Sequence, residues 1–543
     1  MKKFSALLLS LILVLMTFLP VTANAQTACN CNELPIIYVR GRATILRDKS
    51  QPRDDETNPA LPYLAPGKAE ELIKELVPVY YKCYRSDDFE PFRVLFTQRM
   101  AEVYEDYALD NNGNVKNNSG LPDTDYWRNK NVIDNHKAST AVETPRQAHD
   151  EIYKYFFQYD CRLDPCDTAD DLYDFIQKVK EVTGHDKIKI VGRCLGAGIL
   201  SAYLAEYGWS DISDVLIYNS IMNGTAVNNS LFNGELYFDA DAVDFFATQN
   251  LDDTAIFSLI KQIITLANKT YGLDMTMDYF NKTGTKVARL VVPDAMRVSY
   301  GTTPGYWSMV SAENYIEARD YIFAGVEDEF AGLIARLDNY YNTVSSKLND
   351  MYKQMEADGV HIYNISKYGY QLYPIMEDAD YQSDMIVTVE QQAPGTTCAP
   401  IGSKFDDAYI AAAEEKGTAK YISPDRQIDA STSLFPDTTW YIKNIEHNNF
   451  PVVIDELIYR IMRFSSGRMT VWDNERFPQY LIYAGEENNK DSIRPMSETD
   501  QGYSIEEPSF FDLLHNLTKS VIVCLGELFN VIVERIKTQL ITQ

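Results

Sequence analysis

Cysteine, histidine and positive charge are all scarce in this chain of 543 residues. Its 8 cysteines include no Cys-x-x-Cys pair and no Cys/His spacing typical of zinc, which argues against a disulfide-built scaffold or a zinc module. Acidic residues outnumber basic ones by 78 to 50, and a net charge of −28 repels phosphate backbones. We therefore expect no nucleic-acid binding. No nucleotide loop, metal motif or cofactor signature is present, and we expect neither a metal nor a cofactor.

The first residues have the pattern of a secretory signal. Two lysines precede an apolar run from about Leu7 to Leu19, and small residues lead to a cleavage point after Ala25. The run is shorter than the ~20 residues that a membrane span needs, which favours cleavage over an uncleaved anchor. The sequence thus predicts a signal peptide at 1–25 and a secreted, extracellular protein. In that oxidising environment Cys161 and Cys166 could form a disulfide, although the pairing stays open.

Short apolar runs alternate with amphipathic segments through the first part of the chain. Four runs have the composition of buried strands: 36–39, 155–159, 188–191 and 215–218. Three segments have helical periodicity: 68–81, 168–182 and 195–207. Alternating strands and helices predict an α/β fold with a mostly parallel sheet and helices on both faces.

The alternation stops after the fourth strand. From about Asn223 to Ala357 the pattern is helical throughout, which predicts a helical cap inserted into the sheet. Later strand signals lie at 361–364, 385–389, 419–422 and 439–442, and a closing helix is expected at 451–464. We therefore divide the chain into a signal peptide, an N-terminal core part, a cap, a C-terminal core part and a tail: 1–25, 26–222, 223–357, 358–465 and 466–543.

The tail is predicted to be a polar linker, near 486–500, followed by an amphipathic helix. Aliphatic residues recur at three- and four-residue steps from Leu514 to Leu540. Charged residues such as Glu527 and Arg535 interrupt this stripe too often for a membrane span. We expect the helix to dock on the main domain, with peripheral membrane binding and self-association as the alternatives.

The motif that carries chemistry is Gly192-Arg193-Cys194-Leu195-Gly196, between an apolar strand and a helix. It is the Gly-x-Ser-x-Gly nucleophile elbow with cysteine in place of serine. The glycines permit a sharp turn, and a helix N-terminus stabilises both a thiolate and an oxyanion. The motif predicts Cys194 as a nucleophile; the alternative is a tight turn that holds a structural cysteine.

A nucleophile of this kind is followed along the chain by an acid and then a histidine. Of the six histidines, only His447 follows the elbow in a loop between a predicted strand and a predicted helix. Asp425 follows the predicted strand at 419–422 and is favoured as the acid over Asp429. An aspartate in this place would fix the imidazole tautomer and stabilise its charged form.

Two backbone N–H groups are needed to hold an oxyanion. Leu195, directly after the nucleophile, supplies one, and Arg42 would supply the other from the loop after the first strand. Gly41 permits the bend that this loop requires.

These motifs resemble the lecithin:cholesterol acyltransferase-like branch of the α/β-hydrolases, as seen in secreted bacterial relatives. The likeness covers about 33–220 and 358–465. Four segments carry it: 35–41, 159–165, 187–198, and 424–428 through His447. The run Tyr-Asp-Cys-Arg-Leu-Asp-Pro at 159–165 resembles the family's Tyr-Asp-Trp-Arg-x-x-Pro. The run from Pro424 to Ile428 resembles the family's Asp-Gly-x-Val segment.

The resemblance implies an α/β-hydrolase fold with a cap. It also implies Cys194 as the nucleophile, Asp425 as the acid and His447 as the base. The expected activity is that of an esterase- or lipase-like hydrolase, or of an acyltransferase. Such an enzyme acts on a small-molecule or lipid ester or thioester through an acyl-enzyme.

Two other interpretations stay open. A catalytically inactive hydrolase-fold protein could serve as an extracellular binding module. Polyhydroxyalkanoate synthases also use Gly-x-Cys-x-Gly, but their acyl-CoA substrate is intracellular, and an exported enzyme would rarely meet it.

Overall fold

The computed structural model describes most of the chain between its two ends. The described residues are 33–41, 46–51, 58–65, 67–121, 154–250, 255–270, 272–373, 376, 380–464, 467–485 and 492–500. The predicted signal peptide and the predicted C-terminal helix lie outside them, as do Cys29, Cys31 and Cys524.

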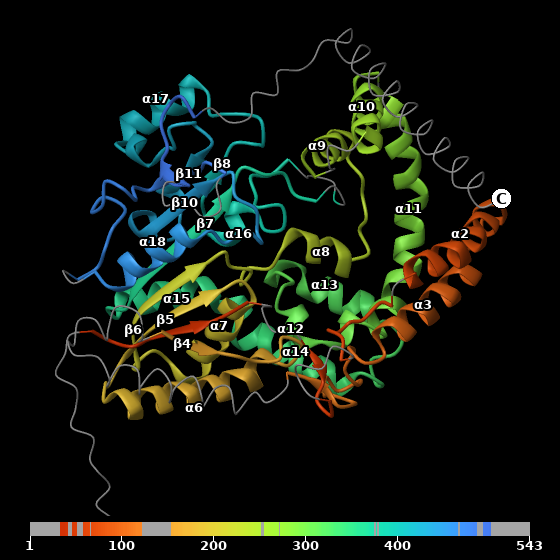
Figure 1. Cartoon of the computed structure of the whole chain (residues 1–543), viewed down its shortest axis with the longest axis horizontal. Coiled ribbons are helices and arrows are strands. Elements are labelled where there is room, and N and C mark those ends of the chain that lie inside the picture. Colours follow the sequence, from red (N-terminus) through yellow and green to blue (C-terminus); the bar gives the residue numbers. More distant parts are fainter. Residues whose placement is uncertain are drawn as a thin grey trace, which may run out of the picture.

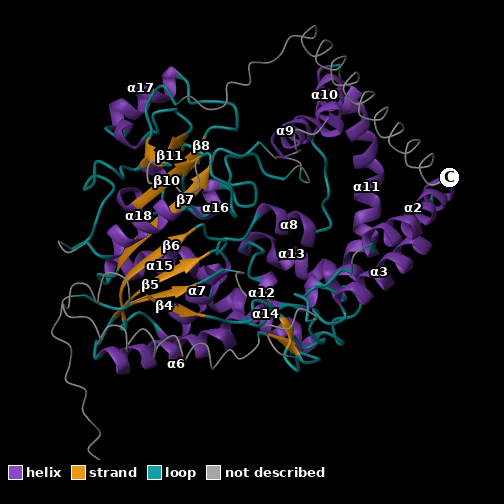
Figure 2. Ribbon diagram, viewed as in Figure 1, coloured by secondary structure: helices purple, strands orange, loops and turns teal. Residues whose placement is uncertain are grey.

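An eight-stranded sheet forms the centre of the molecule (Figures 1 and 2). Its strands, in spatial order, are β4 (Lys154–Phe157), β1 (Ile36–Val39), β5 (Ile188–Arg193), β6 (Ile212–Tyr218), β7 (His361–Tyr368), β10 (Thr439–Lys443), β11 (Tyr480–Tyr483) and β12 (Ile493–Pro495). Every neighbouring pair is parallel except β11 with β12. The predicted α/β class, with a mostly parallel sheet, is confirmed.

Helices cover both faces of this sheet. On one face lie α6 (Pro165–Thr183), α7 (Leu195–Tyr207) and α15 (Leu348–Ala357), and on the other lies α18 (Val452–Met462). Strand residues are apolar in continuous runs because both faces are buried, so that Ile190 contributes to one apolar cluster and Val191 to the other. The face predicted for the helix at 168–182 is buried as expected, through Leu172, Phe175, Ile176 and Val179.

Among the described residues between β6 and β7, all regular secondary structure is helical. Its helices before α15 are α8 (Ala226–Phe232), α9 (Ala240–Asn250), α10 (Ala255–Lys269), α11 (Gly272–Arg297), α12 (Pro304–Trp307), α13 (Ala312–Ile322) and α14 (Ala331–Thr343). Residues of α12, α14 and α15 share one apolar cluster with the sheet. Figure 1 shows α10 and α11 projecting away from the strands.

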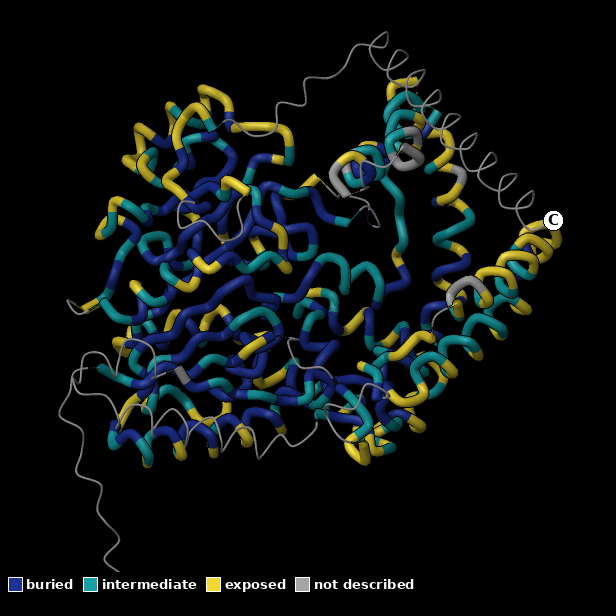
Figure 3. Tube along the Cα trace, in the orientation of Figure 1, coloured by how far each residue is buried: buried dark blue, intermediate teal, exposed yellow. Residues whose placement is uncertain are grey.

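Two helices from the N-terminal part pack on this projection. They are α2 (Lys68–Ser86) and α3 (Glu90–Tyr104), and α3 lies against α11. Cys83 and Phe89 form a separate buried cluster there with Val287, Val291 and Ala295. Figure 3 shows more exposed residues in α2 and α3 than in the sheet. Residues 68–104, which the sequence assigned to the core, thus pack with the insertion.

The second half of the chain differs most from expectation. The predicted strand at 419–422 is a single 3-10 turn, Ala419–Tyr421. The predicted strand at 385–389 is a tight turn that leads into α16 (Val389–Gln392). Conversely, β11 and β12 lie in the predicted tail, so the sheet continues beyond residue 465. Short apolar runs of four or five residues carry too little periodicity to separate strands from turns.

Smaller elements complete the described structure. Two short antiparallel pairs, β2 (Arg47–Asp48) with β3 (Ser119–Gly120) and β8 (Thr397–Cys398) with β9 (Ile428–Asp429), lie outside the main sheet, and α17 (Asp407–Lys416) precedes β9. No described helix combines the length and apolar character needed to cross a membrane. The cysteines in the described residues, Cys161 and Cys166 included, form no disulfide.

Candidate active site

The predicted elbow connects β5 to α7. Cys194 lies between them with φ 51° and ψ −127°, a backbone conformation that residues other than glycine rarely adopt. Gly196 makes the turn sterically feasible, because a Cβ there would lie 2.3 Å from the backbone oxygen of Val39. The turn places the half-buried thiol of Cys194 at the N-terminus of α7, at the carboxyl edge of the sheet.

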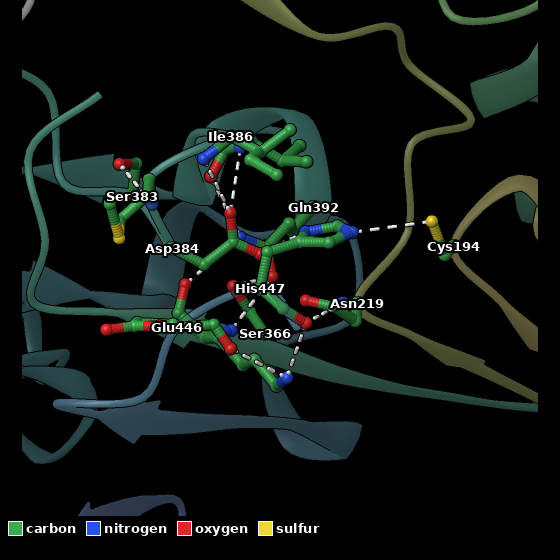
Figure 4. Close-up of polar contacts among 12 residues, drawn as sticks. Cys194, Asn219, Ser366, Ser383, Asp384, Ile386, Gln392, Glu446 and His447 are labelled. Atoms are coloured by element: carbon green, nitrogen blue, oxygen red, sulfur yellow. Dashed lines mark hydrogen bonds and ion pairs between the residues drawn. The ribbon is translucent and has the colours of Figure 1, made fainter. Parts of the chain in front are cut away.

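Three side chains meet at this edge (Figure 4). The Cys194 Sγ lies 3.3 Å from Nε2 of His447, and His447 Nδ1 lies 2.7 Å from Oδ2 of Asp384. The other carboxylate oxygen of Asp384 accepts the N–H groups of Ile386 and Val387 at 3.1 and 2.8 Å. The N–H of His447 also donates to the backbone oxygen of Asp384 at 2.9 Å. The imidazole is therefore held in one orientation, with Nε2 toward the sulfur.

The charges of these groups favour an ion pair. Burial alone would lower the pKa of His447, but the charge and hydrogen bond of Asp384, with Cys194, raise it to about 10. Burial would raise the pKa of the Cys194 thiol. The hydrogen bond and charge of His447, the Leu195 N–H and the Arg193 cation outweigh burial, and the pKa of the thiol is lowered. The arrangement can thus hold a thiolate beside an imidazolium.

The topology explains why residues so far apart in sequence meet. Cys194 follows β5, Asp384 follows β7 and His447 follows β10, and these strands are parallel, so their carboxyl ends face the same edge. Cys194, Asp384 and His447 follow one another along the chain in the order that an elbow of this type requires of a nucleophile, an acid and a histidine. The structure brings Cys194 and His447 together as predicted, but the aspartate beside His447 is Asp384 and not Asp425.

The loop after β1 lies against Cys194. A Cβ on Gly41 would lie 2.8 Å from the Cβ of Cys194, so only glycine fits there without displacement. The preceding backbone oxygen, that of Arg40, accepts the Tyr159 hydroxyl at 2.7 Å, which anchors the loop. The backbone N–H of Leu195 contributes to the lowered pKa of the Cys194 thiol. Arg42 lies outside the described residues, so its role as the second oxyanion donor stays a prediction.

The expected place of Asp425 beside His447 is wrong. Its Oδ2 lies 2.5 Å from Nζ of Lys443, and its Oδ1 accepts the Ser423 hydroxyl at 2.5 Å. The competitor Asp429 instead accepts the Tyr409 hydroxyl at 2.9 Å. The physical reason is that 419–422 is no strand, so Asp425 does not follow a strand that leads to the site.

Asp425 and Lys443 form a buried ion pair, with side-chain exposures of 0% and 2%. Asp425→Asn leaves the ammonium buried without a carboxylate, and we expect it to lower the free energy of unfolding by about 3–5 kcal/mol. Urea unfolding followed by circular dichroism measures this change. Asp407→Asn, which breaks an exposed pair with Arg426 in the same region, is the control and should leave stability unchanged. Equal stability of Asp425→Asn and the unmodified protein would contradict a stabilising pair.

The residue that sequence reasoning missed is Asp384. It lies in a turn in which Met385 has φ 82°, a region that favours glycine. The family's Asp-Gly-x-Val pattern therefore fits Asp384-Met385-Ile386-Val387, with methionine in the glycine position. That pattern, placed after the strand that contains Tyr363, was the available signal. No group of three or more His, Cys, Asp or Glu side chains suited to a metal ion occurs in the described residues.

No family model matches the chain, and no curated protein matches it. Among solved structures, the chain is similar to one described as the crystal structure of the Tle4–Tli4 complex, at 9% identity and a TM-score of 0.27, over 91% of this chain and 99% of that one. The mostly parallel sheet, the elbow after β5 and the chain order of Cys194, Asp384 and His447 are those of an α/β-hydrolase fold.

Proposed function

We propose that this chain is an exported enzyme that hydrolyses or transfers the acyl group of an ester or thioester, with Cys194 as the nucleophile. The observation that carries the proposal is the 3.3 Å approach of the Cys194 sulfur to an imidazole that Asp384 holds at 2.7 Å. Export is inferred from the N-terminal leader alone.

In the first half-reaction, the Cys194 thiolate attacks the carbonyl carbon and a carbon–sulfur bond forms. The carbonyl oxygen becomes an oxyanion, which the N–H of Leu195 stabilises in this proposal. When the tetrahedral intermediate collapses, the bond to the leaving group breaks. The His447 imidazolium gives its Nε2 proton to the departing oxygen or sulfur, which leaves an acyl thioester on Cys194.

In the second half-reaction, water or an acceptor alcohol or amine attacks this thioester. His447, now neutral, takes the proton of the attacking group, and Asp384 stabilises the charge that forms on the ring. Collapse then releases the acid or the acylated acceptor and restores the thiolate. A thioester is more reactive than an oxygen ester, so an acceptor competes well with water, and both hydrolysis and transfer fit this site.

The resemblance to the lecithin:cholesterol acyltransferase-like branch supports a small-molecule or lipid acyl substrate. Two of its segments have defined places beside the site. Tyr159, from the Tyr-Asp-Cys-Arg run, anchors the loop that precedes Gly41. In the same run, buried Arg162 bonds Asp160 and the backbone oxygen of Tyr107, at 2.7 Å in each case. Through Tyr159, the run thus holds the loop from which Arg42 would supply the second oxyanion donor.

The proposal predicts an unusual pH dependence for the thiol. Because His447 lowers the pKa of Cys194, the thiolate should persist below the ~8.5 of an ordinary thiol. Because the pKa of His447 is raised to about 10, the imidazolium should accompany it up to that pH. We therefore expect iodoacetamide to label Cys194 rapidly and selectively at about pH 6, as read by peptide mass spectrometry.

His447→Ala is the matched variant for this experiment. Without the imidazolium, burial dominates, and alkylation of Cys194 should require alkaline pH. Two results would contradict the ion pair between Cys194 and His447: labelling of the thiols without preference at pH 6, or an unchanged pH profile of Cys194 labelling in His447→Ala. Either result would favour the binding-module interpretation.

A further inference from the structure

Lys367, in β7, has a buried ammonium group that the mechanism above does not use. The residue is 0% exposed, and it forms an ion pair with no carboxylate among the residues that the structure describes. Its Nζ instead donates to three backbone carbonyls, those of Glu446 at 3.0 Å, His447 at 3.0 Å and Asn449 at 2.7 Å. Three acceptors match the three N–H bonds of an ammonium group.

All three carbonyls belong to the loop between β10 and α18, which carries the base of the proposed reaction. The carbonyl of His447 also accepts the side-chain amide of Asn219 at 3.0 Å. We propose that Lys367 is a positioning residue, which fixes the His447 loop so that Nε2 lies against the Cys194 sulfur. As a statement about a reaction, this inference rests on the proposed function.

The ring of Phe450 links Lys367 to the elbow as well. The Lys367 Nζ lies 4.1 Å from the ring centroid of Phe450, at the end of the loop, and the Arg193 guanidinium carbon lies 3.1 Å from that centroid. Arg193 directly precedes the nucleophile. Phe450 therefore connects, through two cation–π contacts, the loop that carries His447 to the turn that carries Cys194.

A buried cation is a costly way to hold a loop, since an ammonium loses its hydration on burial. Burial is also the main reason that the pKa of Lys367 is lowered to about 7, against the opposing charges of Asp384, Cys194 and Glu446. An apolar residue would fill the same space, but it would leave three buried carbonyls without donors. The lysine binds three carbonyl oxygens of one loop with a single atom, which an apolar side chain cannot do.

The chain offers a closely matched control. Lys443 is 2% exposed and lies on β10, the strand that pairs with β7, where it is opposite Tyr368. Its Nζ binds Asp425 and the side-chain oxygen of Gln427, at 2.5 and 2.8 Å, and donates to none of the three loop carbonyls. Removing either lysine should destabilise the fold, but only removal of Lys367 should release His447.

The test compares Lys367→Met, Lys367→Gln and Lys443→Met in the full chain. Urea unfolding establishes that each variant is folded, and the rate of iodoacetamide labelling at Cys194 is then measured from pH 5 to 10. A misplacement of about 1 Å at a reacting pair costs on the order of 100-fold, so we expect Lys367→Met to slow labelling at pH 6 by roughly 10- to 100-fold. Its profile should shift toward the ~8.5 of an ordinary thiol.

Lys367→Gln keeps an N–H donor, so its labelling rate at pH 6 should lie between those of the unmodified protein and Lys367→Met. If Lys367→Met does not fold, the glutamine variant decides the test. Lys443→Met should unfold at lower urea yet keep the unmodified profile. Unchanged labelling in folded Lys367 variants, or an equal shift in folded Lys443→Met, would overturn the proposal. Labelling requires no substrate. A protein inactive toward esters and thioesters that shows these shifts would thus refute the proposed function and leave the positioning role intact.

Discussion

Cys194→Ala is expected to abolish acyl transfer, while Cys194→Ser keeps a fraction of it. Alanine removes the only atom that can form the acyl bond, and losses on the order of 10⁴- to 10⁶-fold accompany removal of a nucleophile that works with a histidine. Serine retains a hydroxyl at the same strained turn. It lacks the low pKa of a thiol, so it should be slower than the unmodified protein and faster than alanine.

The measurement is the turnover of a panel of acyl esters and thioesters by the three proteins at equal concentration. Alkylation of the remaining cysteines in each variant controls for altered folding around the elbow. Equal rates in all three proteins would exclude the sulfur of Cys194 from the reaction.

Asp384→Asn should be nearly as damaging, although it changes one oxygen to a nitrogen. The amide would present the wrong hydrogen-bonding partner to Nδ1 of His447 and remove the charge that raises the pKa of the ring. In a serine hydrolase with the same aspartate–histidine hydrogen bond, this change costs on the order of 10⁴-fold in turnover. The measurement is turnover on the best substrate of the panel, together with the pH profile of Cys194 labelling.

Asp425→Asn is the matched control, since both aspartates are buried and each pairs with a basic side chain. Asp425 contacts Lys443 and not His447, so its variant should lose stability while it keeps turnover at a temperature where it stays folded. Loss of turnover in folded Asp425→Asn, with activity retained in Asp384→Asn, would reverse the assignment of the acid.

Most of the first half of the fold could be predicted from sequence. Strands such as 188–191 are buried on both faces, so they are apolar in continuous runs. The helix that contains Leu172 has a full apolar face. The sequence does not show where α2 and α3 pack, because an apolar helix face does not identify its partner. Their partner is α11, much later in the chain.

The meeting of Cys194 with His447 could be predicted for a different reason. The elbow is a local motif, in which Gly192 and Gly196 mark a turn whose sterics exclude larger residues. Histidine is rare here, so chain order and a loop position left His447 as the candidate. Neither argument depends on the rest of the fold.

The acid was not predictable in the same way, because acidic residues are abundant and its place depends on strand order. The run Met385-Ile386-Val387 has the apolar composition of a strand, yet it forms the turn that donates two N–H groups to Asp384. Because this run was predicted to be a strand, the prediction placed the acid at Asp425. Positive φ at Met385, which defines this turn, cannot be inferred from a methionine.

The most direct test of the account is to trap the acyl-enzyme. The protein is mixed with a short-chain activated thioester and quenched in acid within seconds, and its intact mass and peptides are measured. We expect one added acyl group, on the peptide that contains Cys194, accumulating in Asp384→Asn more slowly than in the unmodified protein and absent from Cys194→Ala. An adduct of equal amount in Cys194→Ala, or one carried by another residue, would contradict the account.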